Sequence, residues 1–139
     1  MIISPSIRIL LRIQLGITIL FILFKVIRSQ VVKEELATWV KVFLYSFPNF
    51  AEAIVGPMTV CGLVLMANNR FLKEKTRLSN QFIYTITIVF SGVYVILQEF
   101  KIHNLGGRNV YDLNDVIFSV IGLLTSYGIF LWLKPNIKD

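Results

Sequence analysis

The sequence has little charge and a single cysteine. Lys, Arg, Asp and Glu make up 16% of its 139 residues, whereas hydrophobic residues make up 55%. A soluble domain is typically about 25% charged, and a chain this short has too little interior to hide so much apolar surface from water. We therefore expect one integral membrane domain covering residues 1–139. Cys61 has no partner for an intrachain disulfide, which leaves the redox compartment open.

Several motifs that mark common chemistries are also missing. The sequence has no G-x-S-x-G nucleophile motif and no strong metal-ligand spacing, so we expect no metal and no cofactor, while enzymatic activity stays open. The net charge of +6 would suit a nucleic-acid partner, but the aromatic–basic motifs of nucleic-acid modules are absent. In a membrane protein, basic residues more often reflect topology and anionic headgroups.

Four hydrophobic stretches predict membrane-spanning helices. They cover about residues 9–27, 47–67, 78–98 and 116–133. A spanning helix needs roughly 20 apolar residues, and the first stretch is the weakest because its charge-free part covers only residues 13–24. No small-x-small cleavage site follows it, so we expect a retained helix rather than a signal peptide. The predicted fold is an all-α membrane bundle of four helices.

Residues 30–46, between the first two spans, are amphipathic. Val32, Leu36, Trp39, Val40 and Phe43 recur at helical spacing, and the charged residues fall largely elsewhere. We expect an interfacial helix lying in the membrane surface, with Trp39 in the headgroup layer. The alternative is a helical extension of the second span.

The distribution of basic residues predicts the orientation. The link at residues 70–77 carries four basic residues against one acid, which is the densest basic cluster in the chain. By the positive-inside rule this link is cytoplasmic, and with four spans both termini are then cytoplasmic as well. In this multi-pass cell-membrane topology, four acidic residues converge on the outer face: Glu52, Glu99, Asp112 and Asp115.

The loop before the last span concentrates polar chemistry. The Gly-Gly pair at 106–107 allows a tight turn that would bring Arg108 back towards Glu99. Asp112 and Asp115 are three residues apart and would share a face at the start of a helix. An arginine offers a planar fork of donors to a carboxylate or a phosphate. Three interpretations stay open: an ion-pair network between the third and fourth spans, a pocket for a lipid headgroup or envelope precursor, and loop charges that are simply solvated.

Two further features lie inside the spans. Glu52 is a carboxylate early in the second span, and such a group needs a partner, for which Arg108 and Lys101 are the candidates. Gly122 and Ser126 form a small-xxx-small pair, which lets a neighbouring helix approach closely. The first feature is a candidate ligand-binding or ion-pair residue, and the second is a candidate helix-packing site.

At these positions the sequence resembles the VanZ-like family of small membrane proteins. The resemblance covers residues 99–128 and rests on Glu99, Gly107-Arg108, the stretch VYDLNDV at 110–116, and Gly122. The sequence departs from the family pattern at Ile102, Ser119 and Ser126, where the family more often has Gln, Asn and Gly. The resemblance implies association with resistance to glycopeptide antibiotics of the teicoplanin type. It also implies that Glu99, Arg108, Asp112 and Asp115 are the motif positions.

Three classes of function follow from these observations. The first is a VanZ-like envelope protein whose outer Glu/Arg/Asp site contacts a lipid headgroup or an envelope precursor. The second is a membrane enzyme that acts on a headgroup, with paired carboxylates as acid and base. The third is an oligomeric pore or effector, or a small membrane subunit of a larger assembly, in which Gly122 and Ser126 mediate association with a second copy or a partner subunit.

Overall fold

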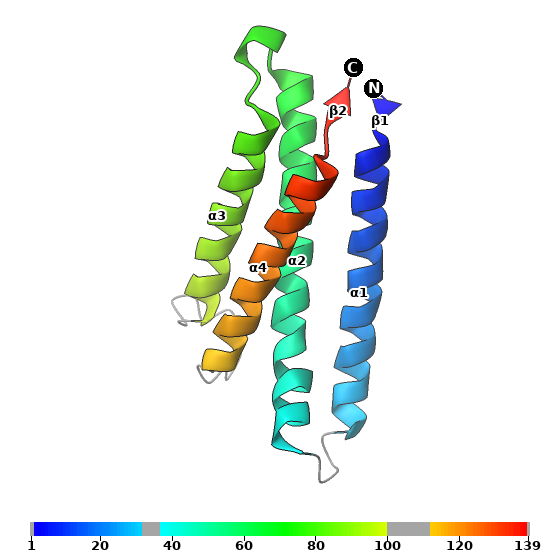
Figure 1. The fold of residues 1–139 in the computed structure, drawn as a ribbon, viewed down its shortest axis with the longest axis vertical. Coiled ribbons are helices and arrows are strands. Elements are labelled where there is room, and N and C mark those ends of the chain that lie inside the picture. Colours follow the sequence, from blue (N-terminus) through cyan, green and yellow to red (C-terminus); the bar gives the residue numbers. More distant parts are fainter. Residues whose placement is uncertain (1, 32–36, 100–111, 139) are drawn as a thin grey trace.

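The structure, a computed structural model, describes residues 2–31, 37–99 and 112–138. In these ranges four long helices make up the fold (Figure 1): α1 (Pro5–Val31), α2 (Thr38–Phe71), α3 (Asn80–Glu99) and α4 (Leu113–Leu133). Each is long and apolar enough to cross a membrane. The predicted all-α fold with four membrane-compatible helices is therefore confirmed, and it suggests a multi-pass membrane protein.

Helix α2 is the central element of the bundle. It contacts each of the other three helices, and its contact with α4 is the most extensive. Helices α1 and α3 lie on opposite sides of α2, and α4 lies in front of it in Figure 1. Helix α4 therefore covers one side of α2, and α1 and α3 flank it.

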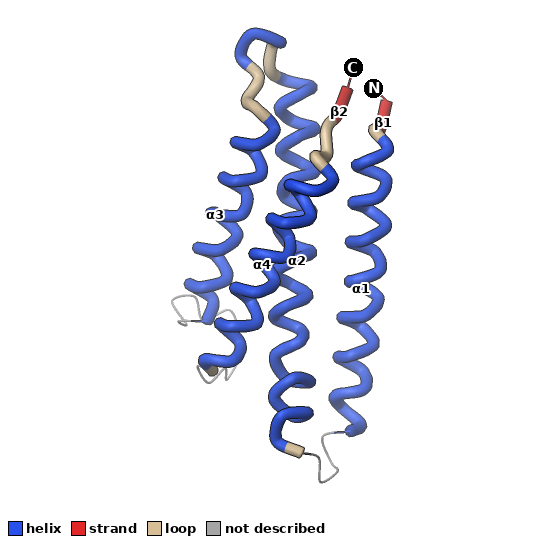
Figure 2. The backbone as a smooth tube through the Cα atoms, viewed as in Figure 1, coloured by secondary structure: helices blue, strands red, loops and turns tan. Residues whose placement is uncertain are grey.

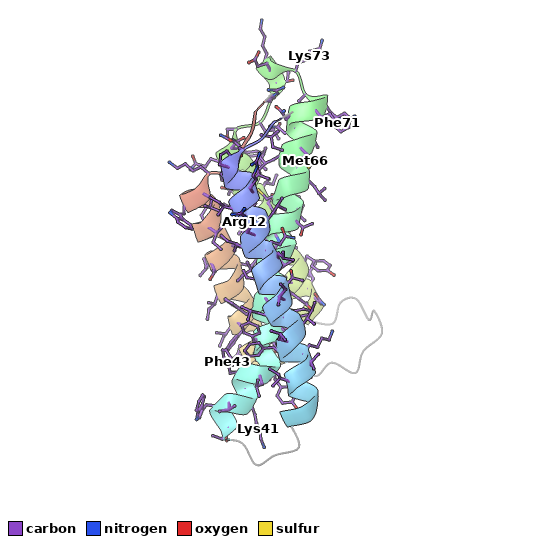
Figure 3. The ribbon with its side chains drawn as sticks, turned by 90° about the vertical axis from the view of Figure 1, so that its right-hand side faces the viewer. Arg12, Lys41, Phe43, Met66, Phe71 and Lys73 are labelled. Carbon is purple, nitrogen blue, oxygen red and sulfur yellow. The ribbon has the colours of Figure 1, made fainter. Side chains whose placement is uncertain are left out.

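Both chain ends lie at the same end of the bundle as the α2–α3 link (Figure 2). Strand β1 (Ile2–Ile3) pairs antiparallel with strand β2 (Ile137–Lys138). The link contains the short 3₁₀ helix η1 (Glu74–Thr76), and the buried Asn68 side chain fixes its far end. That amide accepts from Leu78 N at 2.9 Å and donates to Leu78 O at 3.1 Å. Figure 3 shows Lys73 at this end and Lys41 at the other.

The separate interfacial helix is not confirmed. Residues 38–46 continue without a break into the second span as the first turns of α2, which is the alternative stated above, and residues 32–36 lie outside the described part. Aromatic packing holds these turns against α1. The Phe24 ring stacks on Phe47 with centroids 4.0 Å apart, and it meets the Phe43 ring edge-on at 5.7 Å. This packing favours an upright helix over one that lies flat.

Small residues allow α4 to approach α2 closely. A Cβ atom added at Gly122 would lie 2.5 Å from Phe50 O and 2.9 Å from Ala53 Cβ, so only glycine fits there. Ser126, one turn further on, is fully buried. Between membrane helices, packing of this kind replaces the hydrophobic effect as the source of association. The small-xxx-small pair of Gly122 and Ser126 thus packs inside the bundle of a single chain.

Candidate functional site

The two aspartates predicted at the outer face begin α4. Asp112 is the N-cap, and its carboxylate accepts a hydrogen bond from Asn114 N at 2.8 Å. Asp115 lies in the first turn and is half-buried, and its Oδ1 accepts from Ser46 Oγ at 2.7 Å. Ser46 belongs to α2 and is 1% exposed, so this bond joins the starts of two parallel helices. A lone serine carries no sequence pattern that would have revealed the contact.

The rest of the predicted cluster is only partly described. Glu99 is the last residue of α3, which brings its backbone to the same end of the bundle as the start of α4 (Figure 1). Arg108 and Lys101 lie outside the described residues. An ion-pair network of Glu99, Arg108 and Asp115 stays a prediction.

Glu52 lies in the middle of α2 and away from Asp115. It is fourteen residues past Thr38, which is about 21 Å along the helix at about 1.5 Å per residue. Relative to Ser46 it is also turned by about 240° around the helix axis, because each residue adds about 100°. Glu52 therefore faces other helices than Asp115 does, and the structure does not bring the two carboxylates together.

Glu52 lines two adjoining cavities between α1, α2 and α3. Their volumes are about 290 and 340 Å³, and they share Glu52, Gly56 and Tyr94. We call them together the Glu52 groove; among the residues that line it are Thr18 and Phe21 of α1, Glu52 and Gly56 of α2, and Ser91, Tyr94 and Gln98 of α3. Glu52 and Gly56 are exposed at its floor. The groove is open to the side of the bundle, where a membrane would place lipid.

Helical periodicity explains why polar groups meet in this groove. On α3, Ser91, Tyr94 and Gln98 are spaced i, i+3, i+7, and on α2, Glu52 and Thr59 are seven residues apart. Such positions lie on one helix face. The polar contacts continue beyond the groove, where Gln14 of α1 donates to Thr59 Oγ1 at 2.7 Å. Each helix thus turns polar side chains towards the same face of the bundle.

Lys25 of α1 brings a positive charge to the groove. Its Nζ lies 5.4 Å from the centroid of the Phe21 ring, which lines the groove, because a helical side chain leans towards the N-terminus of its helix. The ammonium interacts electrostatically with the Glu52 carboxylate. Within the described part of the chain, no ion pair within 4.0 Å and no hydrogen bond satisfies Glu52.

These groups define what the groove can do chemically. It presents a carboxylate, a phenol and a primary amide on an apolar background, with the Lys25 ammonium near the Phe21 ring that lines it, and this combination suits binding of a polar headgroup. Among the described residues, no group of three His, Cys, Asp or Glu side chains could hold a metal ion. No protein-family model, curated protein or solved structure matches this chain. The function of this protein is therefore inferred from the side chains that line the groove, not from a relative.

Sequence reasoning found Glu52 but missed its surroundings. A charge inside an apolar stretch is visible in the sequence, whereas the electrostatic interaction with Lys25 of α1 is not. Arg108 and Lys101 lie outside the described residues, so their role as partners of Glu52 stays a prediction. The signal that would have found the α3 wall is its polar stripe at helical spacing, Ser91, Tyr94 and Gln98, in an otherwise apolar span.

The Ser46–Asp115 bond supplies a test of how α2 and α4 are held together. Ser46→Ala removes the donor and leaves a half-buried carboxylate without it, so the free energy of unfolding in detergent should fall by about 1 kcal/mol, within the range for interhelical hydrogen bonds in membrane proteins. Thr125→Ala is the control, because the Thr125 hydroxyl donates only to Ile121 O of its own helix. If Ser46→Ala and Thr125→Ala have the same free energy of unfolding, the hydrogen bond between Ser46 and Asp115 does not stabilise the bundle.

Proposed function

We propose that this protein binds the polar headgroup of a membrane amphiphile in the Glu52 groove. The observation that supports this is an exposed carboxylate in the middle of an apolar helix, in an open cavity, with no partner within 4.0 Å among the described residues. An ionisable group in a membrane-spanning segment is costly and is usually retained for function. A headgroup would supply the partner that Glu52 lacks among the described residues.

The amphiphile belongs to the cell envelope in this proposal. The resemblance of residues 99–128 to the VanZ-like family supports a role in resistance to glycopeptide antibiotics, with a membrane lipid or a lipid-linked envelope precursor as the ligand. The charged residues at the start of α4, Asp112 and Asp115, lie near the end of the bundle from which a headgroup would enter. The resemblance adds Glu99 and Arg108 to this proposal as motif positions.

The experiment compares Glu52→Gln with Glu74→Gln, which makes the same change in the exposed link. Lipid that co-purifies with the full chain is measured by native mass spectrometry, and susceptibility to a teicoplanin-type glycopeptide is measured in cells with equal protein levels. Glu52→Gln should lose bound amphiphile and antibiotic protection, whereas Glu74→Gln should keep both. If Glu52→Gln keeps its bound lipid, the groove is not the binding site; if only protection is unchanged, the resistance role fails.

We also propose that both termini and the α2–α3 link are cytoplasmic, because that link carries the densest basic cluster. Single cysteines at Thr76 and Ala37 test this in a Cys61→Ala background. An impermeant maleimide applied to intact cells should label position 37 at once and position 76 only after permeabilisation. The reverse pattern would invert the topology and move the Ser46–Asp115 end of the bundle to the cytoplasm.

A further inference from the structure

Glu52 lines the groove, and the Lys25 ammonium lies 5.4 Å from the centroid of the Phe21 ring, which also lines it. Two opposite charges are therefore near each other at the groove without being paired. Lys25 and Glu52 interact electrostatically, yet no ion pair within 4.0 Å joins them in the described part of the chain. Two separated charges of opposite sign are complementary to a zwitterion. A zwitterionic headgroup would place its cation at Glu52 and its phosphate at Lys25, and it would satisfy both in one step.

We propose that the ligand is a glycerophospholipid whose headgroup carries a phosphodiester and a primary ammonium, as in phosphatidylethanolamine. This inference rests on the proposed function and names its ligand class. The ammonium group donates N–H bonds to the Glu52 carboxylate, and the phosphate lies at Lys25. Charge-assisted hydrogen bonds of this kind are about twice as strong as neutral ones. Tyr94 and Gln98 on the α3 wall supply further hydrogen-bonding groups.

The chemistry of the groove selects against two other common headgroups. A quaternary ammonium, as in phosphatidylcholine, has no N–H to give to a carboxylate and is instead recognised by cages of several aromatic rings. Phe21, Phe90 and Tyr94 line the groove, but the Phe21 ring already has the Lys25 ammonium near it, and a quaternary ammonium would still leave the Glu52 carboxylate without an N–H donor. An anionic headgroup without an amine, as in phosphatidylglycerol, would leave Glu52 without a partner. We therefore expect the protein to retain phosphatidylethanolamine more strongly than phosphatidylcholine or phosphatidylglycerol.

The experiment uses the full chain in nanodiscs made from equal amounts of phosphatidylethanolamine, phosphatidylcholine and phosphatidylglycerol with identical acyl chains. Lipids that stay bound after mild extraction are quantified by native mass spectrometry. The wild-type protein should retain phosphatidylethanolamine about tenfold over each of the others, which corresponds to one strong discriminating interaction. Glu52→Gln should lower retention of phosphatidylethanolamine until any remaining preference is within about twofold. Lys25→Gln should lower retention of all three lipids because each carries a phosphate.

Matched controls come from the α2–α3 link. Glu74→Gln and Lys73→Gln make the same charge changes at exposed positions, and both should keep the wild-type preference. Retained preference in Glu52→Gln, or retention of phosphatidylglycerol above phosphatidylethanolamine, would overturn the inference. A dimer that Glu52→Gln dissociates would overturn it too and would assign the groove to a second copy of the chain.

Different results would contradict this inference and the proposed function. If the protein retains lipid in the groove without preferring a primary amine, the ligand class is wrong and the headgroup-binding role stands. If filling the groove leaves all lipid retention unchanged, the headgroup-binding role itself fails. Gly56→Phe, which adds a ring at a position shared by both cavities, therefore belongs in the same series.

Discussion

Replacing Gly122 with alanine is expected to destabilise the bundle more than the same change at any other described glycine. The added Cβ would lie 2.5 Å from Phe50 O and 2.9 Å from Ala53 Cβ, and neither a backbone carbonyl nor a Cβ can rotate away. Overpacking in a close-packed interior typically costs about 1–3 kcal/mol, and a clash with backbone belongs at the upper end. The measurement is the midpoint of unfolding in mixed micelles with an increasing fraction of denaturing detergent.

The control for this change lies in the same helix. A Cβ added at Gly128 meets nothing within 4 Å, and alanine favours a helix by up to about 1 kcal/mol over glycine. Gly128→Ala should therefore be as stable as the wild-type protein or more stable. If Gly122→Ala and Gly128→Ala have the same unfolding midpoint, α4 does not approach α2 as closely as described.

Replacing Gly56 with phenylalanine should abolish ligand binding without unfolding the protein. Gly56 is exposed at the floor of the Glu52 groove, and a Cβ there meets nothing within 4 Å. The ring would occupy the space beside Glu52 that both cavities share, which excludes a headgroup. Retention of bound amphiphile should fall at least tenfold, about 1.4 kcal/mol or more in binding free energy, while the unfolding midpoint stays near that of the wild type.

Gly62→Phe is the matched control for the groove-filling variant. Gly62 also lies in α2, a Cβ there also meets nothing within 4 Å, and the residue lines neither cavity of the Glu52 groove. The two variants add the same ring to the same helix, so only the position differs. Equal loss of lipid in both would indicate a general effect on the bundle, and no loss in either would show that the groove does not hold the ligand.

The helices were predictable from the sequence because length and apolarity alone decide whether a segment can span a membrane. The ends of α1 and α2 were not, because a helix satisfies its own backbone hydrogen bonds and continues beyond its apolar stretch. The amphipathic pattern of residues 38–46 indicates a helix, yet it does not say whether that helix lies flat or joins the second span. The packing of Phe24 on Phe43 and Phe47 decides this, and such a contact between helices leaves no periodic signal.

The site was predictable only in part for the same reason. A carboxylate such as Glu52 is conspicuous in an apolar stretch, so its importance can be inferred from one residue. Its neighbours depend on how α1, α2 and α3 are rotated about their axes, which no local pattern fixes. The bond between Ser46 and Asp115 joins residues 69 positions apart in the chain, and only the parallel alignment of α2 and α4 brings them together.

A photoreactive phenylalanine analogue at position 94, on the α3 wall of the groove, tests most directly whether a phospholipid occupies it. Irradiated membranes should give a chain whose mass has increased by one phospholipid, and Glu52→Gln should remove most of that adduct. The same analogue at Phe82, which is 50% exposed on α3 and does not line the groove, should give a lower yield that is indifferent to Glu52. A crosslink to a second chain at position 94, or a lipid adduct there that persists undiminished without the Glu52 carboxylate, would contradict headgroup binding in this groove.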